Sequence, residues 1–206
     1  MSLFITFEGG EGSGKSIHSR RLYRRLLKRG VPSVLTCEPG GTILGRKIAR
    51  WLKWNNDSDI TPISELMLFN AARAQSVNQI IKPSLQCGKA VISDRYADST
   101  TVYQGAGRNL DTSTVLAVNN AAIQGLKPSL TVLLDVPVEI GLERKREASR
   151  DRFEREDSEF HQRVRDGYLN LAAHEPWRWL VIDGTQSREI IAEVIWEKVG
   201  QLLEGL

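Results

Sequence analysis

The segment Gly9–Ser16 reads GGEGSGKS and fits the pattern GxxxxGK[ST] at every fixed position. It follows the apolar run 3–7 and precedes residues 15–29, whose periodicity is helical, so it joins a predicted strand to a predicted helix. Glycines allow successive N–H groups to face one anion, and the helix N-terminus adds positive charge. This predicts a loop that binds a nucleoside triphosphate, with Lys15 on its β- and γ-phosphates and Ser16 as a Mg²⁺ ligand. The predicted triphosphate contacts are Gly9, Gly10, Glu11, Gly12, Ser13, Gly14, Lys15 and Ser16.

The alternation of strand and helix continues along the rest of the chain. Short apolar runs rich in β-branched residues predict strands buried on both faces of a parallel sheet, and longer amphipathic segments between them predict helices. We therefore expect an α/β fold with a doubly wound, parallel, five-stranded sheet flanked by helices. The predicted strands are 3–7, 33–37, 90–93, 130–136 and 179–182, and the predicted helices are 15–29, 43–54, 61–86, 111–124, 138–149, 157–174 and 187–204.

Composition limits the class of protein. With 206 residues, 41% of them hydrophobic, we expect a single domain over 1–206. The net charge of +3 is diluted among 25 acidic residues, so we expect no nucleic-acid partner. No apolar run approaches the roughly 18 residues that span a membrane, and no export signal is visible, so we expect a cytoplasmic protein. Cys37 and Cys87 are expected to be reduced and near the core, and the three histidines to be exposed.

Four further motifs follow the phosphate loop. They are CEPGGT at 37–42, LFNAAR at 68–73, SDRY at 93–96 and YQG at 103–105. With these motifs the chain resembles the bacterial thymidylate kinases, which phosphorylate dTMP with ATP. The resemblance extends nearly from end to end, through the DRFE of the charged segment 143–157. It implies the P-loop nucleoside monophosphate kinase fold, ATP and dTMP as substrates, Mg²⁺ as cofactor and a homodimer.

The helical motif predicts a base-binding surface. Phe69 and Arg73 are four residues apart, so they share a helix face and can present a ring and a cation to one ligand. A base would stack on Phe69 while Arg73 donates to one of its carbonyls. Without the other motifs Phe69 would be read as a core aromatic. The resemblance adds Gln104 on the base edge, with Thr100 nearby.

The SDRY motif ends a strand at the carboxyl edge of the sheet, where open α/β folds bind ligands. Arg95 can form two hydrogen bonds to an acceptor phosphate. Asp94 can hold the Mg²⁺ shell or orient Arg95, and a structural ion pair is the alternative. The resemblance places Glu11 at the acceptor's 3′-hydroxyl, Glu38 beside the arginines and Tyr103 near the sugar.

The resemblance implies that the charged segment 143–157 forms a mobile lid, because the family carries its catalytic arginine either in the phosphate loop or in such a lid. A solvated helix face is the ordinary interpretation of such a stretch, but the phosphate loop itself contains no arginine. Phosphoryl transfer between two anions needs added positive charge, and an arginine can be worth about 10³–10⁵ in rate. We expect Arg152 to supply it, with Arg150 as the second candidate. The predicted catalytic residues are Lys15, Asp94, Arg95 and Arg152.

Three alternatives are consistent with the phosphate loop. A kinase for another nucleoside monophosphate would keep the loop and the lid. A non-catalytic nucleotide sensor would bind ATP without turnover. A nucleic-acid binder would use the basic lid and would show binding that weakens steeply with salt.

Overall fold

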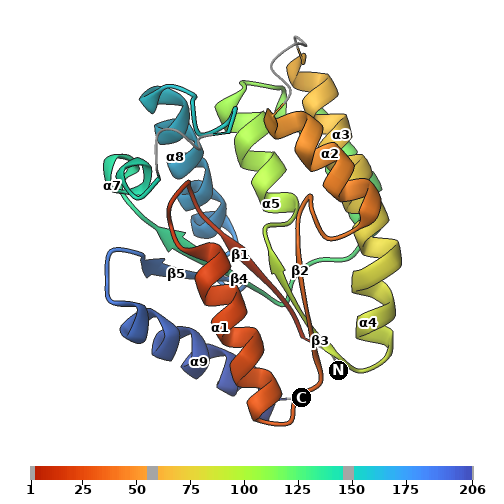
Figure 1. Ribbon diagram of the computed structural model, residues 1–206, viewed down its shortest axis with the longest axis vertical. Coiled ribbons are helices and arrows are strands. Elements are labelled where there is room, and N and C mark those ends of the chain that lie inside the picture. The colour runs from red at the N-terminus through yellow and green to blue at the C-terminus, as the bar shows by residue number, and fades with distance from the viewer. Residues whose placement is uncertain (1–2, 55–59, 146–150, 206) are drawn as a thin grey trace.

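The computed structural model describes residues 3–54, 60–145 and 151–205. Within them lies a parallel sheet of five strands in the order β2-β3-β1-β4-β5 (Figure 1). The predicted sheet is confirmed, and the strand ends shift by no more than one residue. The strands are β1 (Phe4–Glu8), β2 (Ser33–Cys37), β3 (Ala90–Asp94), β4 (Leu130–Asp135) and β5 (Trp179–Asp183).

Helices cover both faces of the sheet. On one face α1 (Lys15–Lys28) and α9 (Arg188–Glu204) pack against the apolar side chains of β1 and β4 (Figure 1). The other face packs against two further clusters, one around Val77 and Tyr96 and one around Val164 and Tyr168. The remaining elements are α2 (Ile43–Trp54), α3 (Pro62–Ser76), the π-helical turn η1 (Val77–Ile81), α4 (Lys82–Gln86), α5 (Ala97–Thr100), the π-helical segment η2 (Thr101–Gly107), α6 (Thr112–Ile123), α7 (Val138–Glu143) and α8 (Ser158–His174).

One helical segment was not predicted. Residues 97–107 form α5 and η2, although their sequence ADSTTVYQGAG is rich in residues of low helix propensity. Val102 and Tyr103 are buried against α8, so tertiary packing outweighs propensity here. The predicted helix 138–149 is too long, since α7 ends at Glu143 and the next two residues are not helical; residues 146–150 lie outside the described part of the chain.

The predicted burial of the cysteines and the predicted exposure of two histidines are wrong. Cys37 and Cys87 are exposed, because Cys37 is the last residue of the edge strand β2 and Cys87 follows the end of α4. Of the histidines expected at the surface, His18 and His161 are buried, each on a face of its helix that packs inward.

The strand order brings the functional motifs to one edge of the sheet. β1 lies between β3 and β4, and its residue Phe7 is in register with Asp94 of β3. Asp94 is also in register with Cys37 at the end of β2. The phosphate loop, the DRY motif and the EPGGT motif therefore leave the sheet side by side.

In the described part of the chain, no helix is both long and apolar enough to span a bilayer.

The central strand generates a stability prediction. Ile5 is fully buried between Ile92 of β3 and Leu130 of β4, so Ile5→Ala leaves a cavity that its neighbours cannot fill. We expect the free energy of unfolding in urea to fall by about 2–5 kcal/mol. The matched control Ile190→Ala, at a position 53% exposed on α9, should change it by less than about 0.5 kcal/mol. Equal losses in the two variants would contradict this description of the core.

Candidate functional site

The loop 9–14 packs closely against neighbouring backbone. Gly9 and Gly12 have φ values of 140° and 66°, in the range that favours glycine. A Cβ on Gly9 would lie 2.6 Å from the carbonyl oxygen of Leu134, and one on Gly12 only 2.0 Å from that of Gly141. These two glycines are therefore required by close packing as well as by the turn.

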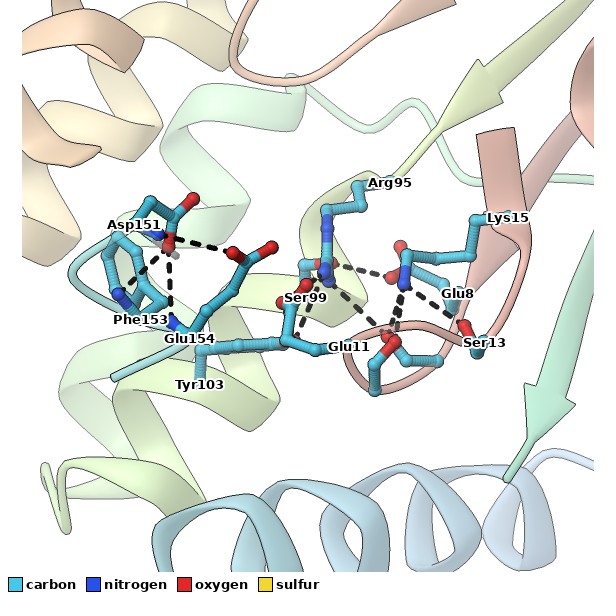
Figure 2. Close-up of polar contacts among 12 residues, drawn as sticks. Glu8, Glu11, Ser13, Lys15, Arg95, Ser99, Tyr103, Asp151, Phe153 and Glu154 are labelled. Carbon is cyan, nitrogen blue, oxygen red and sulfur yellow. Dashed lines mark hydrogen bonds and ion pairs between the residues drawn. The ribbon is translucent and has the colours of Figure 1, made fainter. Parts of the chain in front are cut away.

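Lys15 lies buried inside the loop. Its Nζ donates to the carbonyl oxygens of Gly9 at 2.9 Å and Gly10 at 2.6 Å, and to Ser13 Oγ at 3.1 Å (Figure 2). Burial, together with the positive charge of Arg95, lowers the pKa of Lys15 to about 8. The loop therefore holds its cation among carbonyl groups, in a place where an anionic phosphate would restore its charge.

Ser16 and Asp94 form the predicted metal pair. Ser16 Oγ donates to Asp94 Oδ2 across the mouth of the loop. A hydroxyl and a carboxylate are the hard oxygen donors that Mg²⁺ prefers, so these residues fit that ion. No group of three or more His, Cys, Asp or Glu residues suited to a metal occurs in the described residues. A cation here would thus take most of its ligands from phosphate and water.

Arg95 joins the loop to the rest of the site. It follows β3 with a φ of 73°, an unfavourable conformation for a residue other than glycine, which occurs at sites where a side chain must be aimed. Its Nη2 donates to Glu11 Oε1 at 2.7 Å and to the Tyr103 hydroxyl at 3.1 Å (Figure 2). Its Nη1 donates to Ser99 Oγ at 3.2 Å and to the Tyr168 hydroxyl at 3.3 Å.

The Glu11 carboxyl group favours its charged form although only 13% of the side chain is exposed. Desolvation opposes ionisation, but Arg95 and Lys15 outweigh it, and the pKa of this carboxyl falls below its ordinary value. The Tyr103 hydroxyl also donates to Glu11 Oε1, at 2.7 Å. The acidic residue of the phosphate loop is thereby turned away from Lys15 and toward Arg95 and Tyr103, as Figure 2 shows.

Glu8, which was not predicted as a site residue, is linked to Arg95 through two shared hydroxyl groups. It is fully buried at the end of β1, where Oε1 accepts from the Tyr96 backbone N–H at 2.7 Å. Its Oε2 accepts from Ser99 Oγ at 2.6 Å and from the Tyr168 hydroxyl at 2.9 Å, the two hydroxyls that receive Arg95 Nη1. Burial and the nearby Asp98 raise the pKa of Glu8 to about 7. A carboxylate at the end of a mostly apolar strand was the available signal for it.

Arg73 is held in a second buried network. Its Nε donates to Glu38 Oε2 at 2.8 Å, and its Nη2 donates to the carbonyl of Tyr96 at 3.1 Å. A guanidinium Nη carries two N–H donors, so the second N–H on Nη2 can serve a ligand. The remaining acceptors, all on Nη1, are Asn70 Oδ1, Thr100 Oγ1 and Asn119 Oδ1.

All the residues predicted to bind the acceptor line one pocket. It lies beside the phosphate loop and contains Phe69, which is half-buried at its wall. The predicted residues in its lining are Glu11, Glu38, Phe69, Arg73, Arg95, Thr100, Tyr103 and Gln104, and those not predicted are Pro39, Lys53, Tyr96, Ser99, Asp151 and Phe153.

The structure does not bring Arg152 to the phosphate loop. Its Nη2 donates to Glu65 Oε2 and its Nε to the Leu52 carbonyl at 2.9 Å. Arg144 does contact the loop, where Nη1 donates to the Gly12 carbonyl at 3.3 Å and to the Gly184 carbonyl at 3.2 Å. Arg150 lies outside the described residues.

Known proteins match this chain over nearly its whole length. The family model described as thymidylate kinase matches residues 7–195. A thymidylate kinase of Dehalococcoides mccartyi (strain ATCC BAA-2266 / KCTC 15142 / 195) is 51% identical over 204 residues, 99% of each chain, and one of Geotalea uraniireducens (strain Rf4) is 44% identical over 213 residues, with both chains fully covered. The crystal structure of thymidylate kinase from Ehrlichia chaffeensis superposes with a TM-score of 0.79 at 36% identity, covering 96% of this chain and 98% of that one. With its phosphate loop, parallel sheet and adjoining pocket, this chain belongs to the thymidylate kinase family.

Proposed function

We propose that this protein transfers the γ-phosphoryl group of ATP to dTMP, forming dTDP and ADP. The observation that supports this most strongly is the ion pair between Glu11 and Arg95. Glu11 belongs to the phosphate loop and Arg95 lines the adjoining pocket, and the two side chains are in contact at 2.7 Å, so a donor site at the loop and an acceptor site in the pocket would adjoin at this contact. Two phosphates bound on either side of it would face each other.

The donor half would hold ATP through the loop N–H groups, the N-terminus of α1 and Lys15. Bound phosphate would replace the carbonyl groups of Gly9 and Gly10 as the partner of Lys15. Mg²⁺, held by Ser16 and Asp94 together with phosphate oxygens, would neutralise charge on the transferred group.

The acceptor half would align the dTMP phosphate through Arg95. No general base is needed, because the second pKa of a phosphate monoester is about 6 and the attacking oxygen is ionised at neutral pH. Catalysis then consists of alignment, neutralisation of charge and exclusion of water. Glu8 would keep Arg95 in place through Ser99 and Tyr168.

The same pocket offers groups that match thymine and deoxyribose. Thymine would stack on Phe69 while Arg73 Nη2 donates to a base carbonyl, with Gln104 on the base edge and Thr100 nearby. Glu11 would meet the sugar 3′-hydroxyl, with Tyr103 beside it. Glu38 would act through Arg73, to which it is bonded at 2.8 Å.

The lid would add positive charge at the γ-phosphoryl group. Arg152 would have to leave Glu65 to do so, whereas Arg144 already contacts the loop at Gly12. We therefore assign this role first to Arg144, and to Arg152 or Arg150 only if the lid rearranges when both nucleotides bind.

We further propose a cytoplasmic homodimer that binds neither nucleic acid nor membrane. Both cysteines are free and exposed, which suits a reducing compartment. On α3, the exposed residues Ile63, Met67 and Ala71 recur every four positions and form an apolar stripe, and Leu116 of α6, the helix packed beside α3, is also exposed. Contiguous apolar surface of this kind marks association sites.

An acceptor panel tests the reaction. With ATP and Mg²⁺, a coupled ADP assay should give kcat/KM for dTMP at least about 100-fold above that for dCMP, dGMP or AMP. Lys15→Ala should abolish turnover with every acceptor. Preference for another monophosphate would indicate a different kinase of this fold, and ATP binding without product would indicate a sensor.

The lowered pKa of Lys15 predicts how ATP binding depends on pH. Below about pH 8 Lys15 is protonated and attracts phosphate, and above it the charge is lost. ATP affinity measured by calorimetry should therefore fall about 10-fold between pH 7 and pH 9. In Lys15→Arg, whose guanidinium stays charged, the affinity should stay level over this range, and a parallel fall in both proteins would contradict the assignment.

The dimer proposal predicts the effect of a charge on α3. Met67→Glu, at a position 56% exposed, should convert the dimer to a monomer in sedimentation experiments, because the charge would be desolvated at the interface. Ile190→Glu on α9, 53% exposed, should leave the dimer intact. A monomeric wild-type protein, or a dimeric Met67→Glu, would refute the proposed interface.

A further inference from the structure

Glu65 is a buried carboxylate that the mechanism above does not use. It lies in the first turn of α3 with no exposed surface. Its Oε1 accepts from Gln104 Nε2 at 2.7 Å and from Arg108 Nε at 3.4 Å, and its Oε2 accepts from Arg152 Nη2. One carboxylate therefore connects α3 to η2, to the turn after η2 and to Arg152 of the lid segment.

This contact fixes which way the Gln104 amide faces. Two permanently charged guanidinium groups face Glu65, so its carboxylate accepts hydrogen bonds and does not donate them. Gln104 must then turn its NH₂ group toward Glu65, and its carbonyl oxygen lies on the other side of the amide. Gln104 is 1% exposed and lines the acceptor pocket, so this oxygen is an acceptor that the pocket offers to a base.

An acceptor at this position distinguishes between pyrimidines. Thymine carries a donor, N3–H, between its two carbonyl groups, whereas cytosine carries an acceptor at N3. A buried carbonyl oxygen would accept a hydrogen bond from thymine N3–H. With cytosine the same oxygen would face the acceptor N3 and would be left without a hydrogen bond. The orientation set by Glu65 thus favours thymine.

The same carboxylate also holds the turn Asp151–Glu154, which forms one wall of the pocket. Asp151 Oδ1 accepts from the backbone N–H groups of Phe153 at 3.0 Å and Glu154 at 3.1 Å (Figure 2). Phe153 lines the pocket and packs against Phe69, with ring centroids 5.6 Å apart. Arg152 lies between Asp151 and Phe153 in the sequence, and it connects the turn to Glu65 and to the Leu52 carbonyl.

We infer that Glu65 is a positioning residue that determines base specificity, because it orients the Gln104 carbonyl toward the N3–H of the acceptor base. Through Arg152, Glu65 also couples this orientation of Gln104 to the position of the turn Asp151–Glu154. Glu65 itself does not touch the substrate. The inference rests on the proposed function, because it takes a thymine nucleotide as the acceptor.

The first test is Glu65→Gln, assayed with dTMP and with 5-methyl-dCMP, which keeps the methyl group and reverses the hydrogen-bonding groups at N3 and C4. The new amide can donate or accept, so Gln104 is free to turn over. We expect kcat/KM for dTMP to fall about 10-fold, mostly through KM, and the ratio of dTMP to 5-methyl-dCMP to fall at least about 10-fold. The control Glu156→Gln removes the negative charge of another partner of Arg108, bonded at 2.5 Å, and should leave the ratio unchanged.

The second test is a double-mutant cycle with Arg152→Met. If both residues act through one contact, the double variant should lose no more dTMP kcat/KM than Glu65→Gln alone, within about 2-fold. Additive losses, or a large loss of kcat in Arg152→Met alone, would overturn the coupling and would favour the catalytic role predicted for Arg152.

The two levels of proposal fail in different ways. A wild-type protein that does not phosphorylate dTMP would refute the proposed function. A wild type that does so, with a base ratio unchanged by Glu65→Gln, would overturn only this inference. If Glu65→Gln does not fold, as judged by circular dichroism, Glu65→Asp serves instead. Its shorter carboxylate stays charged but draws back from Gln104, so the base ratio should fall by a smaller factor, and an unchanged ratio would again overturn the inference.

Discussion

The arrangement of this site depends on the ion pair between Glu11 and Arg95. Parallel pairing of β1 with β3 sets the carboxyl ends of the two strands side by side, so a loop residue and a strand-end residue 84 positions apart meet at 2.7 Å. Burial strengthens the attraction between them and would make either charge costly alone. The positive φ of Arg95 and the support of Glu8 are consequences of aiming one guanidinium at this place.

Local patterns in the sequence predict most of the fold and the composition of the site. Five apolar runs mark five strands, and the eight residues expected around an acceptor share one pocket. Such features are readable because strand burial, helix spacing and loop glycines each leave a short-range signature. The helical segment 97–107 leaves none, since packing of Val102 and Tyr103 stabilises it against its own propensity.

Partners distant in sequence are what the chain alone does not reveal. In the sequence Glu8 is an ordinary residue at the end of a strand. Only the fold shows that it accepts hydrogen bonds from the hydroxyls of Ser99 and of Tyr168, the latter 160 residues away. Arg152 is one of several arginines in a charged stretch, and only the fold shows that its partner is Glu65 of α3. The lid contains many cations, so composition cannot assign one of them to the phosphate loop and another to the base end of the pocket.

In the proposed reaction the donor and acceptor phosphates would meet at the Glu11–Arg95 contact, and a single molecule that fills both halves of the site tests this most directly. Calorimetry should be done with adenosine and thymidine joined through their 5′-oxygens by a chain of five phosphates. We expect this compound to bind at least about 100-fold more tightly than ATP or dTMP alone, since linking the two nucleotides removes one association cost. Affinity no greater than that of ATP would show that the two sites are not aligned at this contact.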